Sequence, residues 1–136
     1  MPVNSSHNEN KTNSIIIKAF MCNVFSAILY FTIIAFFALA ALKSDFSTSV
    51  YIFVGYFAGI ISGFINGFII AKITKEKGAL CGLINGLIQA ILCVIVLFFA
   101  NGGIFGKGML ILSGLIIAFA SVGGAVSINL KIKKKY

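Results

Sequence analysis

Charge is nearly absent from the long apolar parts of this sequence. The 136 residues include three acids, one histidine, eleven lysines and no arginine, and 10% of them are charged, whereas a soluble domain carries about 25%. Four stretches of more than 20 residues hold no charged residue and no histidine, and each is long enough to cross about 30 Å of hydrocarbon. This composition excludes a soluble domain. It predicts an all-α integral membrane bundle of four transmembrane helices, at about Ala19–Leu42, Val50–Ala71, Gly78–Ala100 and Gly108–Leu130.

The scarcity of acids and histidine also limits the classes of function that the chain can have. General acid–base catalysis needs a titratable group beside the reacting atoms, and the four stretches offer only thiols and tyrosines. Proton-coupled carriers rely on a carboxylate or histidine inside the membrane. His7 and the cysteines lack the spacing of a metal site, so Cys22, Cys81 and Cys93 are interpreted as small buried hydrophobes. We therefore expect no enzymatic activity, no catalytic residue, no metal and no cofactor.

The lysines lie at or beyond the ends of the apolar stretches, and they favour one side of the predicted bundle. One side carries nine lysines and the other carries two, Lys43 and Lys107. An excess of lysine marks the cytoplasmic side, so both termini are predicted to lie in the cytoplasm. Basic residues at a membrane surface also attract anionic lipid headgroups, and nothing in their placement indicates a nucleic acid partner. The nine are Lys11, Lys18, Lys72, Lys75, Lys77, Lys131, Lys133, Lys134 and Lys135.

The polar ends divide the chain into three parts. Residues 1–14 are rich in Asn and Ser without an apolar period, and they are predicted to form a disordered cytoplasmic tail. Residues 15–130 form the four-helix transmembrane domain, and residues 131–136 form a basic cytoplasmic tail. The segment Ala38-Leu39-Ala40 resembles a signal-peptidase site. The apolar stretch before it is longer than the roughly 7–15 residues of a signal sequence, so the first span is expected to be retained.

Small residues recur every four positions in the second and third stretches. This GxxxG, or glycine-zipper, spacing lets helix backbones approach closely in a bilayer. Because only a short lysine-rich loop separates the two stretches, they are predicted to form an antiparallel hairpin in which Gly63 faces Gly86 and Gly67 faces Gly82. The two ladders are Gly55, Gly59, Gly63 and Gly67 in the second stretch, and Gly78, Gly82, Gly86 and Ala90 in the third.

Polar side chains lie beside these ladders and along one face of the first stretch. Unpaired amides are costly in hydrocarbon, so these residues are predicted to turn inward and meet one another. The favoured interpretation is a set of interhelical hydrogen bonds that fixes the bundle. The functional alternative is a small polar pocket or solute path open to the cytoplasm. The candidate cluster consists of Asn23, Ser26, Ser62, Asn66, Asn85 and Gln89.

Two classes of function remain. The first is a structural or interaction component of the plasma membrane, whose partner is another membrane protein or a second copy of this chain. The second is a passive channel or carrier for a small ion or solute, as a monomer or an oligomer. Ion paths can be built from backbone carbonyls without charged side chains, so the missing charge leaves this second class open.

The four spans, the Gly-rich second and third spans, the turn Lys75-Glu76-Lys77-Gly78 and the lysine-rich end resemble the YrzE-like family of small membrane proteins from spore-forming Gram-positive bacteria. The resemblance implies a multipass protein of the bacterial plasma membrane, with no activity attached to it. In size and in its Asn-Gly pairs the chain also looks like the small four-pass fluoride channels. It departs from them in having no arginine, no Thr/Ser-rich pore phrase and a strong lysine bias, so that channel stays the alternative.

Overall fold

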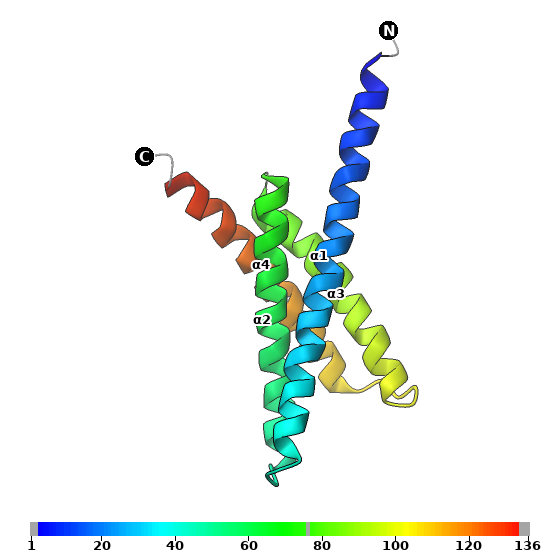
Figure 1. The fold of residues 1–136 in the computed structure, drawn as a ribbon, viewed down its shortest axis with the longest axis vertical. Coiled ribbons are helices and arrows are strands. Elements are labelled where there is room, and N and C mark those ends of the chain that lie inside the picture. The colour runs from blue at the N-terminus through cyan, green and yellow to red at the C-terminus, as the bar shows by residue number, and fades with distance from the viewer. Residues whose placement is uncertain (1–2, 76, 134–136) are drawn as a thin grey trace.

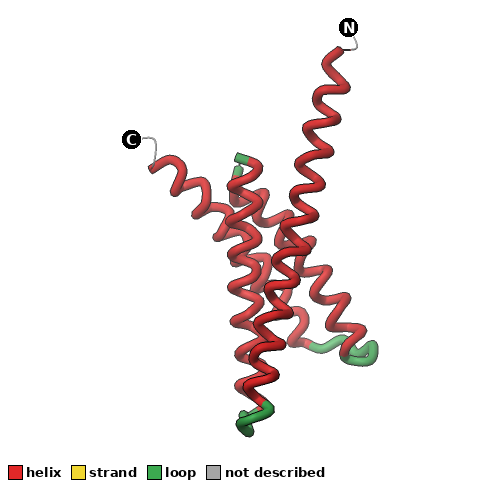
Figure 2. Tube along the Cα trace, viewed as in Figure 1, coloured by secondary structure: helices red, strands yellow, loops and turns green. Residues whose placement is uncertain are grey.

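The computed structural model describes residues 3–75 and 77–133, which form four helices joined by short loops (Figures 1 and 2). No strand occurs within these ranges. Each helix contains a stretch that is long and apolar enough to cross a membrane. The prediction of an all-α, multipass transmembrane bundle is therefore confirmed. The helices are α1 (Val3–Ala41), α2 (Thr48–Thr74), α3 (Gly78–Ala100) and α4 (Lys107–Lys133).

Short loops reverse the chain direction between consecutive helices. Lys75 caps α2 in a left-handed conformation, with φ of 60°, and its N–H donates to the Ala71 carbonyl oxygen at 3.1 Å. Lys77, with φ of 34°, precedes α3. After α3, Gly102 and Gly103 have φ of 68° and 84°, a region that glycine enters without steric cost.

α1 begins earlier than the sequence predicted. Residues 3–14 are helical, so the prediction of a disordered tail over residues 1–14 is corrected for residues 3–14, while residues 1–2 lie outside the described part of the chain. The physical reason is cooperativity: a helix that the apolar span has already nucleated gains one hydrogen bond for each residue added. The side chains of residues 8–14 are all exposed, so this extension projects beyond the bundle without packing against it.

The four helices do not form a square bundle. α2 and α3 are antiparallel neighbours, and α4 packs extensively against both of them. α1 packs along α2 and makes a smaller contact with α3, and over the described residues its backbone does not come close to that of α4. In Figure 1 α4 crosses behind α2, and its red C-terminal part diverges from the blue N-terminal part of α1. Both α1 and α4 therefore pack against the α2–α3 hairpin.

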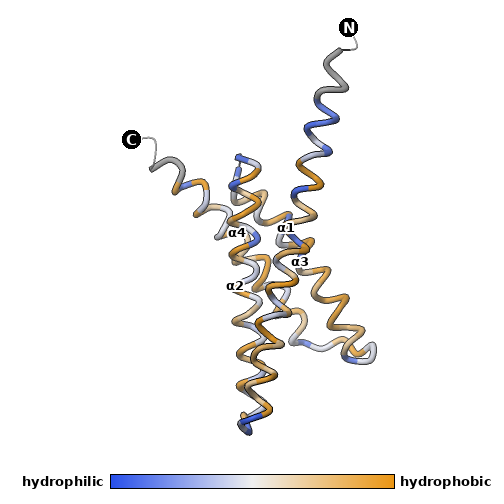
Figure 3. Tube along the Cα trace, in the orientation of Figure 1, coloured by the Kyte–Doolittle hydropathy of each residue, from blue (hydrophilic) through white to orange (hydrophobic). Residues whose placement is uncertain are grey.

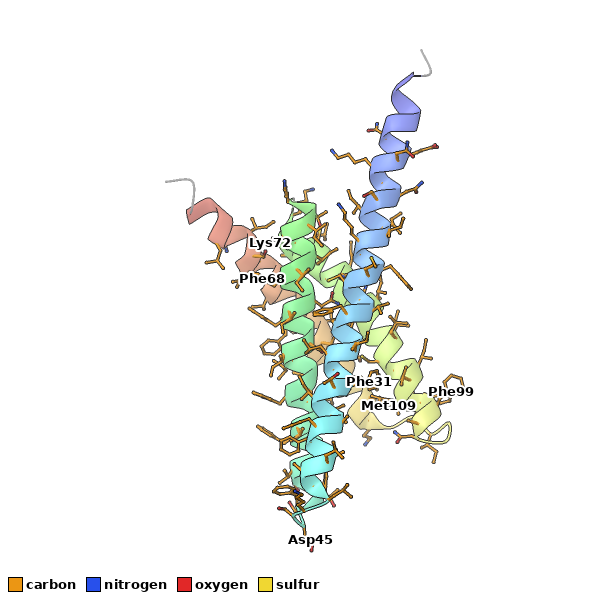
Figure 4. All side chains as sticks on the ribbon, in the orientation of Figure 1. Phe31, Asp45, Phe68, Lys72, Phe99 and Met109 are labelled. Atoms are coloured by element: carbon orange, nitrogen blue, oxygen red, sulfur yellow. The ribbon has the colours of Figure 1, made fainter. Side chains whose placement is uncertain are left out.

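The two ends of the bundle differ. Both termini and the α2–α3 turn lie at one end, which we call the terminal end, and the α1–α2 and α3–α4 loops lie at the other, the loop end (Figure 1). Lys72 and Asp45 mark these two ends in Figure 4. Hydrophilic residues gather at both ends and in the part of α1 that precedes its apolar stretch, while the middle of every helix is mostly apolar (Figure 3). Large apolar side chains also face outward, as Phe36 and Phe99 do at 75% and 76% exposure, which suits contact with lipid.

Candidate functional site

The buried face of α1 is narrow and mostly polar. Its buried residues are Cys22, Asn23, Ser26 and Tyr30, spaced so that they share one side of the helix. This side faces α2 and α3, the two helices that the α1 backbone approaches among the described residues. The polar stripe of α1 is therefore its attachment to the hairpin.

Three asparagines, one from each of α1, α2 and α3, form a closed ring of hydrogen bonds. Asn23 Nδ2 donates to Asn85 Oδ1 at 2.7 Å, Asn85 Nδ2 donates to Asn66 Oδ1 at 2.7 Å, and Asn66 Nδ2 donates to Asn23 Oδ1 at 2.9 Å. The three residues are between 0% and 3% exposed. Each amide both donates and accepts within the ring, so the three helices are fixed at one depth relative to one another.

The ring continues into α3 and α2 through two further side chains. Asn66 Nδ2 also donates to Gln89 Oε1 at 2.5 Å, and Gln89 Nε2 donates to Ser62 Oγ at 3.1 Å. Ser62 Oγ in turn donates to the Gly59 carbonyl oxygen at 3.1 Å. Gln89 and Ser62 are fully buried. The network thus extends about one helical turn away from the ring along the α2–α3 contact.

The α1 side of the network holds two further residues. Cys22 Sγ lies 3.1 Å from Asn66 Oδ1 as a weak donor, which gives Asn66 two donated and two accepted hydrogen bonds. Ser26 is buried but bonds within α1, to the Asn23 carbonyl oxygen at 3.1 Å. The structure therefore brings five of the six candidate polar residues into one network and leaves Ser26 beside it. Cys22 was predicted to be a small buried hydrophobe and not a member of this cluster.

Among the described residues, every buried side-chain nitrogen and oxygen has a hydrogen-bond partner. The amides are thus paired with each other rather than with an open cavity. A polar group of this kind stabilises a bundle when paired, because leaving it unpaired in a low-dielectric interior is costly. The arrangement can fix helix register, and the one titratable group in it is the Cys22 thiol, which donates to Asn66 Oδ1.

The glycine ladders lie on a different face of α2 and α3 from the amides. A β-carbon placed on Gly63 would lie 2.8 Å from the carbonyl oxygen of Ile116, and one on Gly67 would lie 2.6 Å from the carbonyl carbon of Ala120. Both of these neighbours belong to α4. The glycines of α2 therefore let the α4 backbone approach closely.

The ladder of α3 faces the same helix. A β-carbon on Gly82 would lie 3.1 Å from the carbonyl carbon of Ala120, and one on Gly86 would lie 2.5 Å from Ala120 Cβ. α4 contributes small residues of its own, since a β-carbon on Gly124 would lie 3.2 Å from the Gly82 Cα. The prediction that the two ladders face each other is therefore corrected: α4 lies between them and is the partner of both.

The four-residue spacing explains why the partner of the ladders was predicted wrongly. A four-residue ladder identifies the face of a helix but not which helix covers it. α4 carries a four-residue row that fits between the ladders, and this row was the signal that could have identified the partner. Of the ladder residues, Gly55 has open space where its β-carbon would be, and Ala90 packs in a core cluster with Tyr30 and Cys93. The α4 row consists of Leu112, Ile116, Ala120 and Gly124.

The lysines of the candidate set lie at the terminal end. Lys72 is in the last turn of α2, and Lys75 and Lys77 flank the hairpin turn. Lys131 and Lys133 belong to the last turn of α4. Lys134 and Lys135 lie outside the described residues.

A groove of about 330 Å³ opens between α1 and α3 at the terminal-end side of the ring. Its walls are almost entirely apolar, and α2 contributes Ile70 and Thr74 to the lining. Asn23 and Asn85 lie at its inner end but are only 1% and 3% exposed. The lining ends at Asn23 on α1 and at Ile88 on α3, about one turn beyond Asn85, and the buried amides of the ring offer the groove almost no exposed polar surface.

Comparisons of the chain with protein-family models, with curated proteins and with solved structures find no match. The geometry above is therefore the basis for assigning a function.

Proposed function

We propose that this chain is a structural or interaction component of the bacterial plasma membrane, in line with the YrzE-like resemblance. The observation that carries the proposal is the closed ring of Asn23, Asn66 and Asn85. In a solute path, polar atoms must be free to replace water around the solute. In this bundle the polar atoms of the ring are hydrogen-bonded to one another and hold α1 against the hairpin, as a rigid membrane-embedded scaffold requires.

The packing of the other helices supports the same role. α4 is locked between α2 and α3 by close backbone contacts at Gly67, Gly82 and Gly124. In α1, by contrast, only 11% of the most apolar stretch is buried, compared with 33% in α2. A rigid core with a widely exposed first span offers one long apolar surface for contact with another membrane protein or a second copy.

The scaffold role predicts a stoichiometric partner. A tagged chain extracted in mild detergent should retain another membrane protein at a fixed ratio, identified by mass spectrometry of the purified complex. The matched control is the variant Asn66→Leu, in which loss of the ring loosens α1 and should release a partner held through that helix. A chain that purifies as a monomer without a partner, in both forms, would contradict the proposal. A pure homo-oligomer is compatible with both a scaffold that binds a second copy and the channel alternative, and ion flux in liposomes then distinguishes the two.

The proposed orientation places the terminal end in the cytoplasm. The support is the lysine distribution, with nine residues at this end and two at the loop end. In a background without the native cysteines, Ser47→Cys and Asn101→Cys should react with a membrane-impermeant thiol reagent added to intact cells. Thr12→Cys should react only after the membrane is opened. All three positions are exposed in the structure, so accessibility within the protein is matched. Labelling of Thr12→Cys in intact cells would reverse the assignment.

A further inference from the structure

The length and lining of the groove between α1 and α3 suit a chain-like apolar ligand. On α1 it runs from Ile15 to Asn23, which is about 12 Å at a rise of 1.5 Å per residue. One leaflet of a bilayer has a hydrocarbon depth of roughly 15 Å, so the groove follows most of one leaflet. Its lining side chains include Ile16, Phe20 and Ile84, which are between 54% and 64% exposed. A compact polar solute would find almost no hydrogen-bonding partner here.

Two positively charged side chains lie near the terminal end of this groove. Lys11 lies one helical turn before the lining residue Ile15 on α1, and Lys77 lies one turn before the lining residue Cys81 on α3. Both lysines are exposed. Helical side chains lean toward the N-terminal end of their helix, which for α1 and α3 is the terminal end of the bundle. The two ammonium groups therefore extend toward the level of the lipid headgroups.

We propose that the groove between α1 and α3 binds an anionic phospholipid, with one acyl chain along Ile16, Phe20 and Ile84 and the phosphate-bearing headgroup at Lys11 and Lys77. An apolar slot of one-leaflet depth with two cations at its open end is complementary to an anionic amphiphile. A zwitterionic lipid fills the slot equally well but gains less from the lysines. The site requires only the fold, so it does not rest on the scaffold role.

The absence of tryptophan from the chain allows a direct test. In the variant Phe20→Trp the single indole lies in the groove, and in Ile17→Trp it lies at similar depth on α1 but outside it. Each variant is reconstituted in vesicles of phosphatidylcholine and phosphatidylglycerol, with bromine on the acyl chains of one lipid or the other. Brominated phosphatidylglycerol should quench Phe20→Trp more strongly than brominated phosphatidylcholine at the same mole fraction. Ile17→Trp should be quenched equally by both.

The lysines are tested in the same vesicles. Adding Lys11→Gln and Lys77→Gln to Phe20→Trp should lower the preference for phosphatidylglycerol by about fivefold for each lysine, as expected for a basic residue near an anionic surface. Lys43→Gln with Lys107→Gln removes the same charge at the loop end and should leave the preference intact. Circular dichroism in the vesicles checks that each variant is folded. Equal quenching of Phe20→Trp by the two lipids, or a preference that survives the loss of Lys11 and Lys77, would overturn the proposal.

Discussion

Alanine at Gly67 should destabilise the protein more than any other single methyl group added to the α2 ladder. The added β-carbon would overlap the carbonyl oxygen of Ala120 and lie 2.8 Å from its Cα. These are backbone atoms of α4, which cannot move aside as a flexible side chain can. Overpacking costs about 1–3 kcal/mol and more when the backbone must shift, so we expect the free energy of unfolding to fall by about 3 kcal/mol or more. The measurement is reversible unfolding in mixed micelles.

The matched control comes from the same helix and the same ladder. A β-carbon at Gly55 meets nothing within 4 Å, so Gly55→Ala should be neutral or slightly stabilising, because alanine has the better helix propensity. Both variants add one methyl group to α2, and they differ only in what that methyl group meets. Equal effects of the two substitutions would show that α4 does not lie against Gly67.

Leucine at Asn66 should produce the second large loss of stability. The substitution keeps the side-chain size but removes the partner of Asn23 Oδ1, Asn85 Nδ2 and Gln89 Oε1. Hydrogen bonds between membrane helices contribute about 0.6 kcal/mol on average and up to about 1.7 kcal/mol each, so the loss of three should lower the free energy of unfolding by about 2–5 kcal/mol. Asn129→Leu, at an exposed position near the end of α4, is the control and should have little effect.

The ring also predicts that its members are not independent. Once Asn66 is leucine, Asn85 has already lost the acceptor of its Nδ2 group. The double variant Asn66→Leu, Asn85→Leu should therefore cost less than the sum of the two single variants, measured by the same unfolding experiment. Additive costs would mean that the two amides act separately and that the ring does not hold the helices as a unit.

Much of this arrangement follows from the sequence. The apolar stretches predicted four helices, and the third predicted stretch coincides with α3 at Gly78–Ala100. The meeting of Asn23, Asn66 and Asn85 was also predictable, because each amide lies on the polar side of its own helix and an unpaired amide is costly in hydrocarbon. Helical spacing and the energy of burial were sufficient for both inferences.

The partner of the ladders could not be predicted in the same way. Spacing within one helix defines a face, whereas the helix that covers that face depends on the whole assembly. Gly63 and Gly86 both lie against α4 near Ile116, an arrangement that satisfies the same periodicity as a direct contact between them. The helical structure of residues 3–14 was missed for a similar reason. Their composition alone does not show that the helix of the following span can extend into them.

The central claim is that the ring of Asn23, Asn66 and Asn85 joins helices and does not conduct a solute. The most direct test is flux of fluoride, chloride, sodium and potassium ions through the unmodified protein reconstituted in sealed liposomes, compared with empty liposomes and with liposomes holding Asn66→Leu. Neither protein should give flux above that of empty liposomes. Ion-selective flux through the unmodified protein that disappears in Asn66→Leu, while that variant unfolds at the same denaturant concentration, would contradict it.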